Sequence, residues 1–580
     1  MNIPPEPPAD AWLSRFWHAF YARRPVEATF VGRDGHDHEL PHLGEAGIEE
    51  TLSEMRQLLA EARAGGRSAV ERSVVERSAV VALDRGLAEG FLEIQIREHE
   101  SRHLLRNPSV HTGEAVFGLM SLFLPNRPPT TTRVEALRSR IQAIPDFLDR
   151  SRSVLTSAPD AWIRRAAKEC RGGVAFLRRG VAQLGVDHLG VDLGEAPEVA
   201  AAALEGFAAF LDGALPRADD AVACGPETFE LYLKKGHLLD RSADEIADRA
   251  REEMAEARSW LDAKASSVGA ASPEEALARL ADAHPGPESY YDRYREIWTA
   301  MRAIAEEQDL VTWPEFPIRY VPRPAWAREA APDLYFLFYR SPAAFDRPEI
   351  HDYLVAPLDP SRSAAEQESF LRANNDSVIK LNHVVHHGGI GHHVQNWHAF
   401  RSPFSVGRVA AVDGASRIAM FCGGTMAEGW ACYATDVMAE AGAFTELERY
   451  AERHGRVRMC ARAIVDVELH HGRMSLTEAA RFYRDNAGMT PGAAEAEAVK
   501  NSMFPATALM YLVGTDAIHE LRDDLVRETR GRLTLREFHD SFLSYGSIPV
   551  AVTAAEMKRK AALGLPLGAH DHDFERRDQP

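Results

Sequence analysis

The chain has 580 residues, of which 45% are apolar and 26% are charged, the composition of an ordinary folded protein. One hydrophobic core rarely serves so long a chain, so we expect two or three packed lobes. The net charge of −19 argues against non-specific binding to nucleic acid and to anionic membrane surfaces.

The sequence gives no sign of a segment that would lead the chain into or across a membrane. No stretch approaches the roughly 18 consecutive apolar residues of a membrane span. Residues 1–25 lack the basic start and following apolar run of a secretory signal. The five cysteines form no C-x-x-C pair, which indicates reduced thiols. We therefore expect a cytoplasmic protein that contacts no membrane.

Helical spacing of apolar residues runs along most of the chain. In residues 48–64 the apolar side chains recur at the positions of one buried helical face. Comparable patterns occupy residues 79–105, 133–155, 198–215 and 240–265. The last of these contains Ser242 and Glu245 at the spacing of a capping box. The chain is therefore predicted to be mostly α-helical.

Strand-like segments are confined to the middle of the chain. Residues 316–322, 333–339 and 351–357 are short and rich in aromatic and β-branched side chains. They predict a small sheet just before the histidine-rich segment described next.

The Asp/Ala-rich stretch before Gly225 and Pro226 indicates a boundary between lobes. It divides the chain into an N-terminal helical lobe (1–225), a second lobe (226–570) and a polar tail (571–580).

Four histidines fall within the eight residues HHGGIGHH, positions 386–393. On an ideal helix His386 and His393 share a face, whereas His392 would point about a third of a turn away from His386. The three glycines between them disfavour a regular helix, and a bulge would bring His392 onto the face of His386. Such a pair imitates the two histidines of an H-E-x-x-H zinc helix.

Two imidazoles need an anionic third ligand to hold a divalent metal tightly. The candidate is Glu428 in GGTMAEGWACYATDVM, near the start of a helix-like apolar segment. The alternative role is that of an acid placed near a helix N-terminus, which is worth a few tenths to about 1 kcal/mol. The density of histidines favours the metal.

The motifs HHGGIGHHVQ and AEGWACYA together resemble a bacterial domain-of-unknown-function family, number eight-eight-five, of helical zinc metallopeptidases. That family carries a His-Glu-Ala/Gly-x-Pro-Gly-His-His signature followed by Glu-Gly-Trp-Ala-x-Tyr. The segments GPETFELYLKK, RAIVDVELHHGRMSLTEAARFY, FPATALMYLVG and FHDSFLSYGSIPV match further family segments in order. The likeness spans about residues 15 to 555.

The resemblance implies a two-lobed zincin-like fold, similar to oligopeptidases and carboxypeptidases, with the small sheet beside the active-site helix. It implies one divalent metal, Zn²⁺ first and Fe²⁺ or Mn²⁺ as alternatives, in the second lobe. The implied ligands are His386, His392 and Glu428, with His393 beside them as a supporting or substitute ligand. The implied partner is a peptide or small-molecule substrate.

The resemblance also suggests catalytic side chains, and one departure from the family affects them. Tyr511 is the candidate phenol for a developing oxyanion, and His470 the candidate to orient substrate or support the metal. The family's glutamate base is His387 here, and losing such a base can cost about two orders of magnitude in rate. Glu468 stands where the family has glycine and is a candidate replacement acid.

Three functions are compatible with these residues. The first is a metal-dependent hydrolase of a peptide or amide-like small molecule, in which His387 or Glu468 serves the attacking water. The second is a non-hydrolytic metalloenzyme with iron redox or lyase chemistry, in which His387 or His383 adds a ligand. The third is a pseudoenzyme whose metal is closed off by four ligands.

Overall fold

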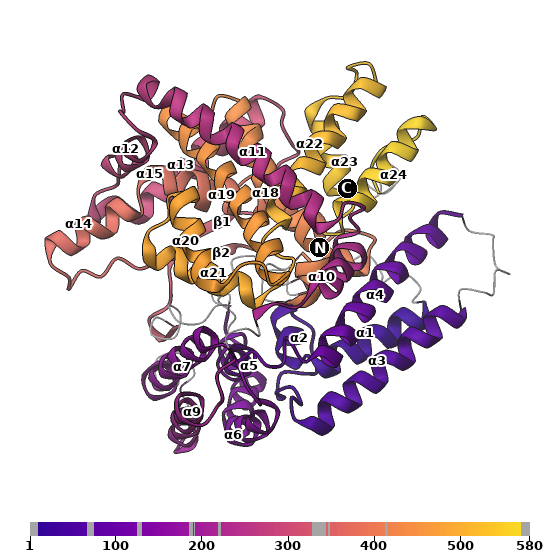
Figure 1. Cartoon of the computed structure of the whole chain (residues 1–580), viewed down its shortest axis with the longest axis vertical. Helices are drawn as coiled ribbons and strands as arrows, with labels where there is room; N and C mark the ends of the chain where they lie inside the picture. The colour runs from indigo at the N-terminus through magenta and orange to yellow at the C-terminus, as the bar shows by residue number, and fades with distance from the viewer. Residues whose placement is uncertain are drawn as a thin grey trace. The chain divides into compact units, whose positions relative to one another are not determined.

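The computed structural model describes residues 10–65, 75–124, 130–184, 190, 192–218, 222–327, 344–345, 349–411 and 416–569 (Figure 1). Helices dominate these residues, which confirms the mostly α prediction. Two of the three predicted strands form; the third, at 333–339, and the tail at 571–580 lie outside the described residues. Within the described parts, no helix combines the length and the apolar character needed to cross a membrane.

The chain divides into two compact units, each described here by itself. Unit 1 comprises Met1–Cys224, Arg323–Arg347 and Gly414–Ser416, and unit 2 comprises the rest. The helices of unit 1 are α1 (Ala11–Arg23), α2 (Pro25–Val31), α3 (Glu45–Gly65), α4 (Val75–Ser101), α5 (Pro108–Met120), α6 (Thr131–Val154), α7 (Asp160–Ala175), the π-helix η1 (Phe176–Gly180), α8 (Val181–Leu184), α9 (Ala196–Gly213) and the short 3₁₀ turn η8 (Ala325–Ala327).

A buried arginine ties the helices of unit 1 together. Arg140 on α6 donates from Nη2 to the hydroxyl of Thr29 on α2 at 2.7 Å and from Nε to the carbonyl of Glu39 at 2.9 Å. It also donates to the carbonyl of Gly118 on α5. Burial lowers the pKa of Arg140 to about 10, so the side chain remains charged at neutral pH. One cation thus binds a hydroxyl oxygen and two carbonyl oxygens from three segments.

Unit 2 contains the remaining helices and the sheet. They are α10 (Pro226–Tyr232), η4 (Leu233–His237), α11 (Ala243–Lys264), η5 (Ala265–Val268), α12 (Pro273–Ala278), η6 (Arg279–Asp282), η7 (Pro287–Ser289), α13 (Tyr290–Glu307), β1 (Ile318–Pro322), β2 (His351–Val355), α14 (Ala364–Ala373), α15 (Asp376–Val378), η10 (Ile379–Gly388), α16 (His392–Ala399), α17 (Ser405–Val409), η11 (Ala419–Gly423), α18 (Gly424–Glu440), α19 (Glu446–His470), α20 (Leu476–Ala487), α21 (Pro491–Met503), α22 (Met510–Glu528), α23 (Leu535–Leu543) and α24 (Val550–Ala562). Of these, η4, η10 and η11 are π-helices and η5, η6 and η7 are 3₁₀ turns.

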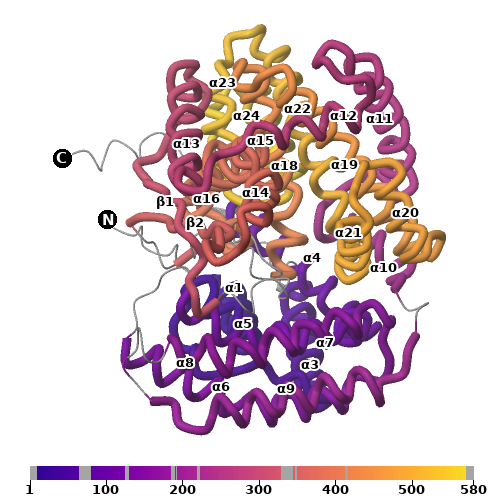
Figure 2. Tube along the Cα trace, turned by 90° about the vertical axis from the view of Figure 1, so that its left-hand side faces the viewer, coloured from indigo at the N-terminus to yellow at the C-terminus, as the bar shows by residue number. Residues whose placement is uncertain are grey.

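The small sheet lies beside the histidine-rich helix. Strands β1 and β2 pair in parallel, with Ile318 opposite His351 and Pro322 opposite Val355 (Figure 2). From β1, the hydroxyl of Tyr320 donates to the carbonyl of His383 at 3.3 Å. From β2, the hydroxyl of Tyr353 lies 2.9 Å from Nδ1 of the same histidine. The sheet therefore holds η10 by two hydrogen bonds to one residue.

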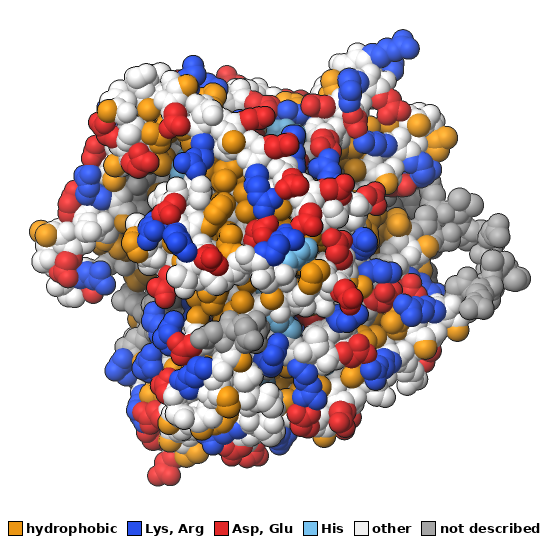
Figure 3. Space-filling model, in the orientation of Figure 1, with side chains coloured by type: hydrophobic (Ala, Val, Ile, Leu, Met, Phe, Trp, Pro, Cys, Tyr) orange, Lys and Arg blue, Asp and Glu red, His pale blue; other side chains and the backbone are white. Residues whose placement is uncertain are grey.

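Basic and acidic side chains intermingle on the molecular face in Figure 3, and its described residues gather no large field of one sign.

Two glycines allow α18 and α22 to cross closely. A Cβ on Gly429 would lie 2.6 Å from the carbonyl carbon of Gly514, and a Cβ on Gly514 would lie 2.1 Å from the carbonyl oxygen of Thr425. Both distances are too short for real carbon atoms. The crossing therefore depends on hydrogen in place of a side chain at both positions, and it fixes Glu428, the neighbour of Gly429, against α22.

We predict that Gly514→Ala lowers the free energy of unfolding by about 2 kcal/mol or more, because the methyl group forces two helices apart. The matched control is Gly455→Ala inside α19, where a Cβ meets nothing within 4 Å. That change should stabilise the protein by about 0.5–1 kcal/mol. Urea unfolding of both variants measures the difference; equal effects would contradict the close crossing.

Candidate metal site

The histidine segment begins as a widened helix. Asn375 caps α15 by accepting a hydrogen bond from the backbone N–H of Val378 at 3.1 Å, and the chain continues as the π-helix η10. A π-helix bonds residue i to i+5, so the side chains that share a face differ from those of an α-helix. The predicted bulge between His386 and His392 is therefore confirmed, in the form of a π-helix followed by a break.

Glycines close the break between η10 and α16. A Cβ on Gly391 would lie 1.9 Å from the carbonyl oxygen of His386, and one on Gly388 would lie 2.1 Å from the hydroxyl oxygen of Tyr320. Two indoles fix the turn: Trp298 donates to the carbonyl of Gly388 at 2.8 Å, and Trp430 to that of Ile390 at 2.9 Å. The turn folds back tightly, so α16 starts with His392 beside the end of η10.

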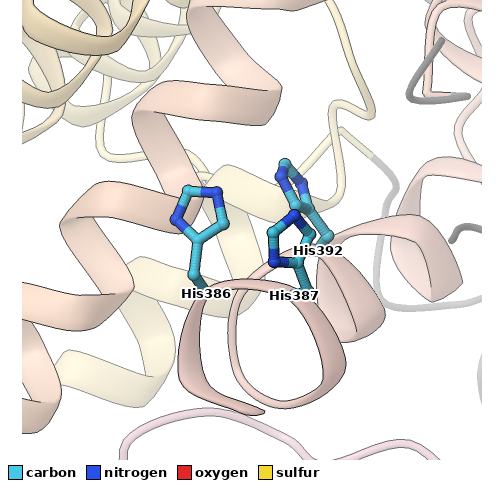
Figure 4. A group of neighbouring side chains, drawn as sticks. All are labelled: His386, His387 and His392. Atoms are coloured by element: carbon cyan, nitrogen blue, oxygen red, sulfur yellow. The ribbon is translucent and has the colours of Figure 1, made fainter. Parts of the chain in front are cut away.

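Three imidazoles converge at this turn (Figure 4). The ring centroid of His386 lies 4.7 Å from that of His387 and 5.0 Å from that of His392, and the last two are 5.4 Å apart. One ring nitrogen from each lies within 4.8 Å of the others. Histidines that would point in different directions on a regular helix thus form one group of possible metal ligands.

Hydrogen bonds at Nδ1 orient two of these rings. Nδ1 of His387 lies 2.7 Å from the carbonyl oxygen of Asn382, and Nδ1 of His392 lies 3.0 Å from Oε1 of Gln395. Gln395 in turn donates its amide to the hydroxyl of Ser547, which directs its oxygen toward His392. In neutral imidazoles these contacts assign the proton to Nδ1 and leave the lone pair on Nε2. This is the usual support of a metal-binding histidine.

Glu428 supplies the acid of the group. Its Oε2 lies 3.4 Å from Nε2 of His386 and 3.7 Å from Nε2 of His392. The π-helix η11 leads into α18, and α18 carries Glu428 into the buried side of the site. Burial alone would raise the pKa of Glu428, but the two imidazoles outweigh burial and hold it well below its ordinary value. Glu428 is therefore a carboxylate at neutral pH.

The donor set fits a divalent metal. Zinc binds imidazole nitrogen and carboxylate oxygen at about 2.0–2.2 Å, which places neighbouring ligand atoms of a tetrahedron about 3.3 Å apart. The two distances from Glu428 to the imidazoles are close to that value. The donor types of His386, His392 and Glu428 match this set, and ring nitrogens of His386, His387 and His392 lie within 4.8 Å of one another.

His393 points away from this group. Its Nε2 lies 2.7 Å from the carbonyl oxygen of Phe316, and its ring stacks on the Phe316 ring at 4.8 Å. Burial lowers the pKa of His393 to about 4, so it is a neutral ring in the core. The structure thus brings His392, and not His393, next to His386 and Glu428.

His470 lies in a different environment from the cluster. Its Nε2 is 2.9 Å from the carbonyl oxygen of Asn501, and its ring stacks on Phe229. Nearby Asp466 accepts the backbone N–H groups of Ala508 at 2.8 Å and Leu509 at 3.0 Å. Asp466 thus fixes the segment that leads into α22, whereas His470 is hydrogen-bonded to the end of α21, and its role toward substrate or metal stays a prediction.

Tyr511 and Glu468 are not members of the histidine group, and each has its own contacts. Tyr511 is half-buried on α22, with the guanidinium of Arg462 4.8 Å from the centre of its ring. Glu468 is ion-paired with Arg473 at 2.8 Å and with Arg251. The proposed role of Glu468 as a replacement acid gains no support, because two arginines already hold its carboxylate.

Sequence reasoning missed several side chains that build the site. Gln395 could have been found, since it lies three residues after His392 on one helix face and can reach its ring. Trp298 and Asn382 carried no comparable signal, because Trp298 reaches the turn through tertiary contact and Asn382 reaches His387 through the π-helix.

Comparisons with known proteins agree on the family and the fold. The family model described as bacterial protein of unknown function (DUF885) matches residues 25–557. Among curated proteins no sequence matches the chain. A solved structure of a "putative lipoprotein of unknown function" from Shewanella oneidensis shares 19% identity, covers 95% of this chain and 100% of its own, and superposes with a TM-score of 0.74. A "putative lipoprotein" from Colwellia psychrerythraea shares 14% identity over 95% and 99%, with a TM-score of 0.73.

We predict that His386→Ala and Glu428→Ala each abolish retention of a divalent metal, because each removes a member of the closest ligand set. His387→Ala should retain much of the metal. Elemental analysis of proteins purified without chelator measures the content, and circular dichroism verifies the fold. Full metal retention by His386→Ala would contradict the ligand assignment.

Proposed function

The chain belongs to the DUF885 family of bacterial proteins of unknown function, and we propose that it is a metal-dependent hydrolase of a peptide or amide-like small molecule. The supporting observation is the approach of Glu428 to both His386 and His392, at 3.4 and 3.7 Å. Two imidazoles and one carboxylate are the ligand set of many hydrolytic zinc sites. Zinc is the first choice of metal, and iron(II) or manganese(II) the alternatives.

The proposed reaction adds water across an amide bond. The hydroxyl joins the carbonyl carbon, the carbon–nitrogen bond breaks, and the leaving nitrogen takes up a proton. A divalent metal supplies polarisation of the carbonyl and a lowered pKa of water. His386, His392 and Glu428 would hold that ion. The proton transfer and the hydrogen bonding to the substrate would fall to His387 and Tyr511.

His387 is the proposed proton acceptor. Its Nδ1 lies 2.7 Å from the carbonyl oxygen of Asn382, which assigns the lone pair of the neutral ring to Nε2, and one of its ring nitrogens lies within 4.8 Å of those of His386 and His392. A neutral imidazole can take the proton of the attacking water and return it to the leaving nitrogen. Tyr511 is proposed to donate its phenolic proton in a hydrogen bond to the developing oxyanion. The proposal includes the two-lobed zincin-like architecture that the resemblance implies. The cytoplasmic location of the protein stays a prediction.

The test is hydrolysis by protein of measured metal content. A mixture of blocked short peptides and N-acyl amino acids is incubated with the protein, and released amines are identified by mass spectrometry. The proposal expects products that disappear in Glu428→Ala. Metal-loaded protein that releases no amine from any of these compounds would contradict it.

A second candidate function is favoured by the position of His387. One of its nitrogens lies within 4.8 Å of those of His386 and His392, so it can also serve as a further ligand. A centre of three imidazoles and one carboxylate suits iron or manganese, and hence redox or lyase chemistry. Near-stoichiometric iron or manganese that falls in His387→Ala would favour this candidate over the hydrolase.

We predict that His387→Glu raises amide hydrolysis by about 100-fold, because it restores the negatively charged acid–base group that the family signature carries at this position. His387→Gln is the matched control, similar in length but unable to accept the proton as a base. The rate of both variants is measured at equal metal content. An unchanged rate in His387→Glu with the metal intact would contradict the assigned position of the base.

A further inference from the structure

We infer that the substrate carries a carboxylate, which Arg462 and Arg458 bind beside Tyr511. This inference rests on the proposed function and names its substrate class: a short peptide with a free C-terminus, or an N-acyl amino acid. The relevant side chains lie on α19, α21 and α22, all in unit 2.

The guanidinium of Arg462 uses only part of its hydrogen-bonding capacity within the described residues. Its Nε donates to Oε1 of Glu497 on α21 at 2.7 Å. Among the described residues, its two terminal nitrogens make no hydrogen bond, although the side chain is only 19% exposed. A half-buried guanidinium normally satisfies its whole planar fork. The free edge of Arg462 is therefore matched to a bidentate acceptor from outside the chain.

Other half-buried arginines of unit 2 are more fully paired. Arg456 binds both Glu253 and Asp516, and Arg522 binds both oxygens of Glu440 at 3.0 and 3.1 Å. These arginines have the structural role of joining helices. Arg462 differs because its terminal nitrogens remain available.

The charge around Arg462 is unbalanced toward the positive. Arg458 lies one helical turn before it on α19, is exposed, and makes no ion pair in the described part of the chain. Burial works against the ionised form of Glu497, yet Arg462, Lys500 and Arg458 lower its pKa to about 2. One carboxylate thus faces three cations, in a chain whose net charge is −19. A second anion bound beside Arg462 would balance this excess of positive charge.

Contacts link Arg462 to the helix crossing that carries Glu428. The Arg462 guanidinium stacks over Tyr511, and Tyr511 lies one turn before Gly514, where α22 crosses α18. Glu428 adjoins that crossing. The spacing from Glu428 to Tyr511 is therefore on the order of 10 Å along the backbones, about three residues of an extended peptide.

A second observation places Arg462 on the same side of α18 as the metal ligand. Cys432 lies one turn after Glu428 on α18. Burial raises the pKa of the Cys432 thiol, Glu428 raises it further, and Arg462 opposes that rise. The same thiol thus lies within electrostatic reach of the metal-binding carboxylate and of the free guanidinium.

The experiment compares three mixtures of N-acetylated tripeptides on the metal-loaded protein. The first mixture has free C-terminal carboxylates and no acidic side chains, the second is the same set as C-terminal amides, and the third contains amides that end in Asp or Glu. Turnover is followed by mass spectrometry, and binding by thermal shift. The third mixture distinguishes a side-chain carboxylate from a terminal one.

The variants are chosen so that folding and binding are separated. Arg462→Lys keeps the charge beside Glu497 but loses the fork, and Arg458→Gln leaves Glu497 paired. Arg449→Gln is the matched control, an exposed arginine on α19 whose Glu446 partner is 3.7 Å away. We expect Arg462→Lys and Arg458→Gln to raise KM for the free acids about 10- to 100-fold with little change in kcat, and Arg449→Gln to change neither.

Each outcome decides one of the two proposals. Preference for carboxylates that is lost in Arg462→Lys supports the inference. Equal turnover and equal binding of acids and amides overturns the inference and leaves the hydrolase standing. Binding of acids that depends on Arg462, without any turnover, overturns the hydrolase and leaves the carboxylate site standing. Neither turnover nor Arg462-dependent binding overturns both.

Discussion

The geometry of the site depends on one close approach of the backbone to itself. At Gly391 the chain passes so near the carbonyl of His386 that a Cβ would lie 1.9 Å from that oxygen. Because glycine removes this clash, the chain can reverse within three residues of the π-helix and start α16 with His392. The two tryptophan donors, from α13 and α18, then hold the reversed turn from outside. Side chains six apart in sequence thus meet on one side.

A second close approach links this turn to the rest of unit 2. The glycines at the crossing of α18 and α22 set Glu428 against the histidines and place Tyr511 a turn away. Backbone contact of this kind leaves little freedom for the carboxylate to shift, because both helices are rigid there. The anion and the phenol consequently belong to one frame of two closely packed helices.

His387 lies on η10, at the position where the family signature that the sequence resembles has glutamate. Its Nδ1 bond to Asn382 is local to the π-helix, and one of its ring nitrogens lies within 4.8 Å of those of the other two imidazoles. From this position His387 can act either as a neutral base or as a further metal ligand. The partly unpaired Arg462 adds a feature that neither role explains, and a negatively charged substrate accounts for it.

The sequence alone determined the helical class and two of the strands, because periodicity is a local signal. Through the dense histidine spacing and the family resemblance it offered His386, His392 or His393, and Glu428 as candidate ligands. It left His392 and His393 unresolved, since the choice depends on how far the helix widens. Tertiary structure decided that choice by pairing His393 with the carbonyl of Phe316. It also assigned His470 to Asn501 and Glu468 to two arginines, because those partners come from helices distant in sequence.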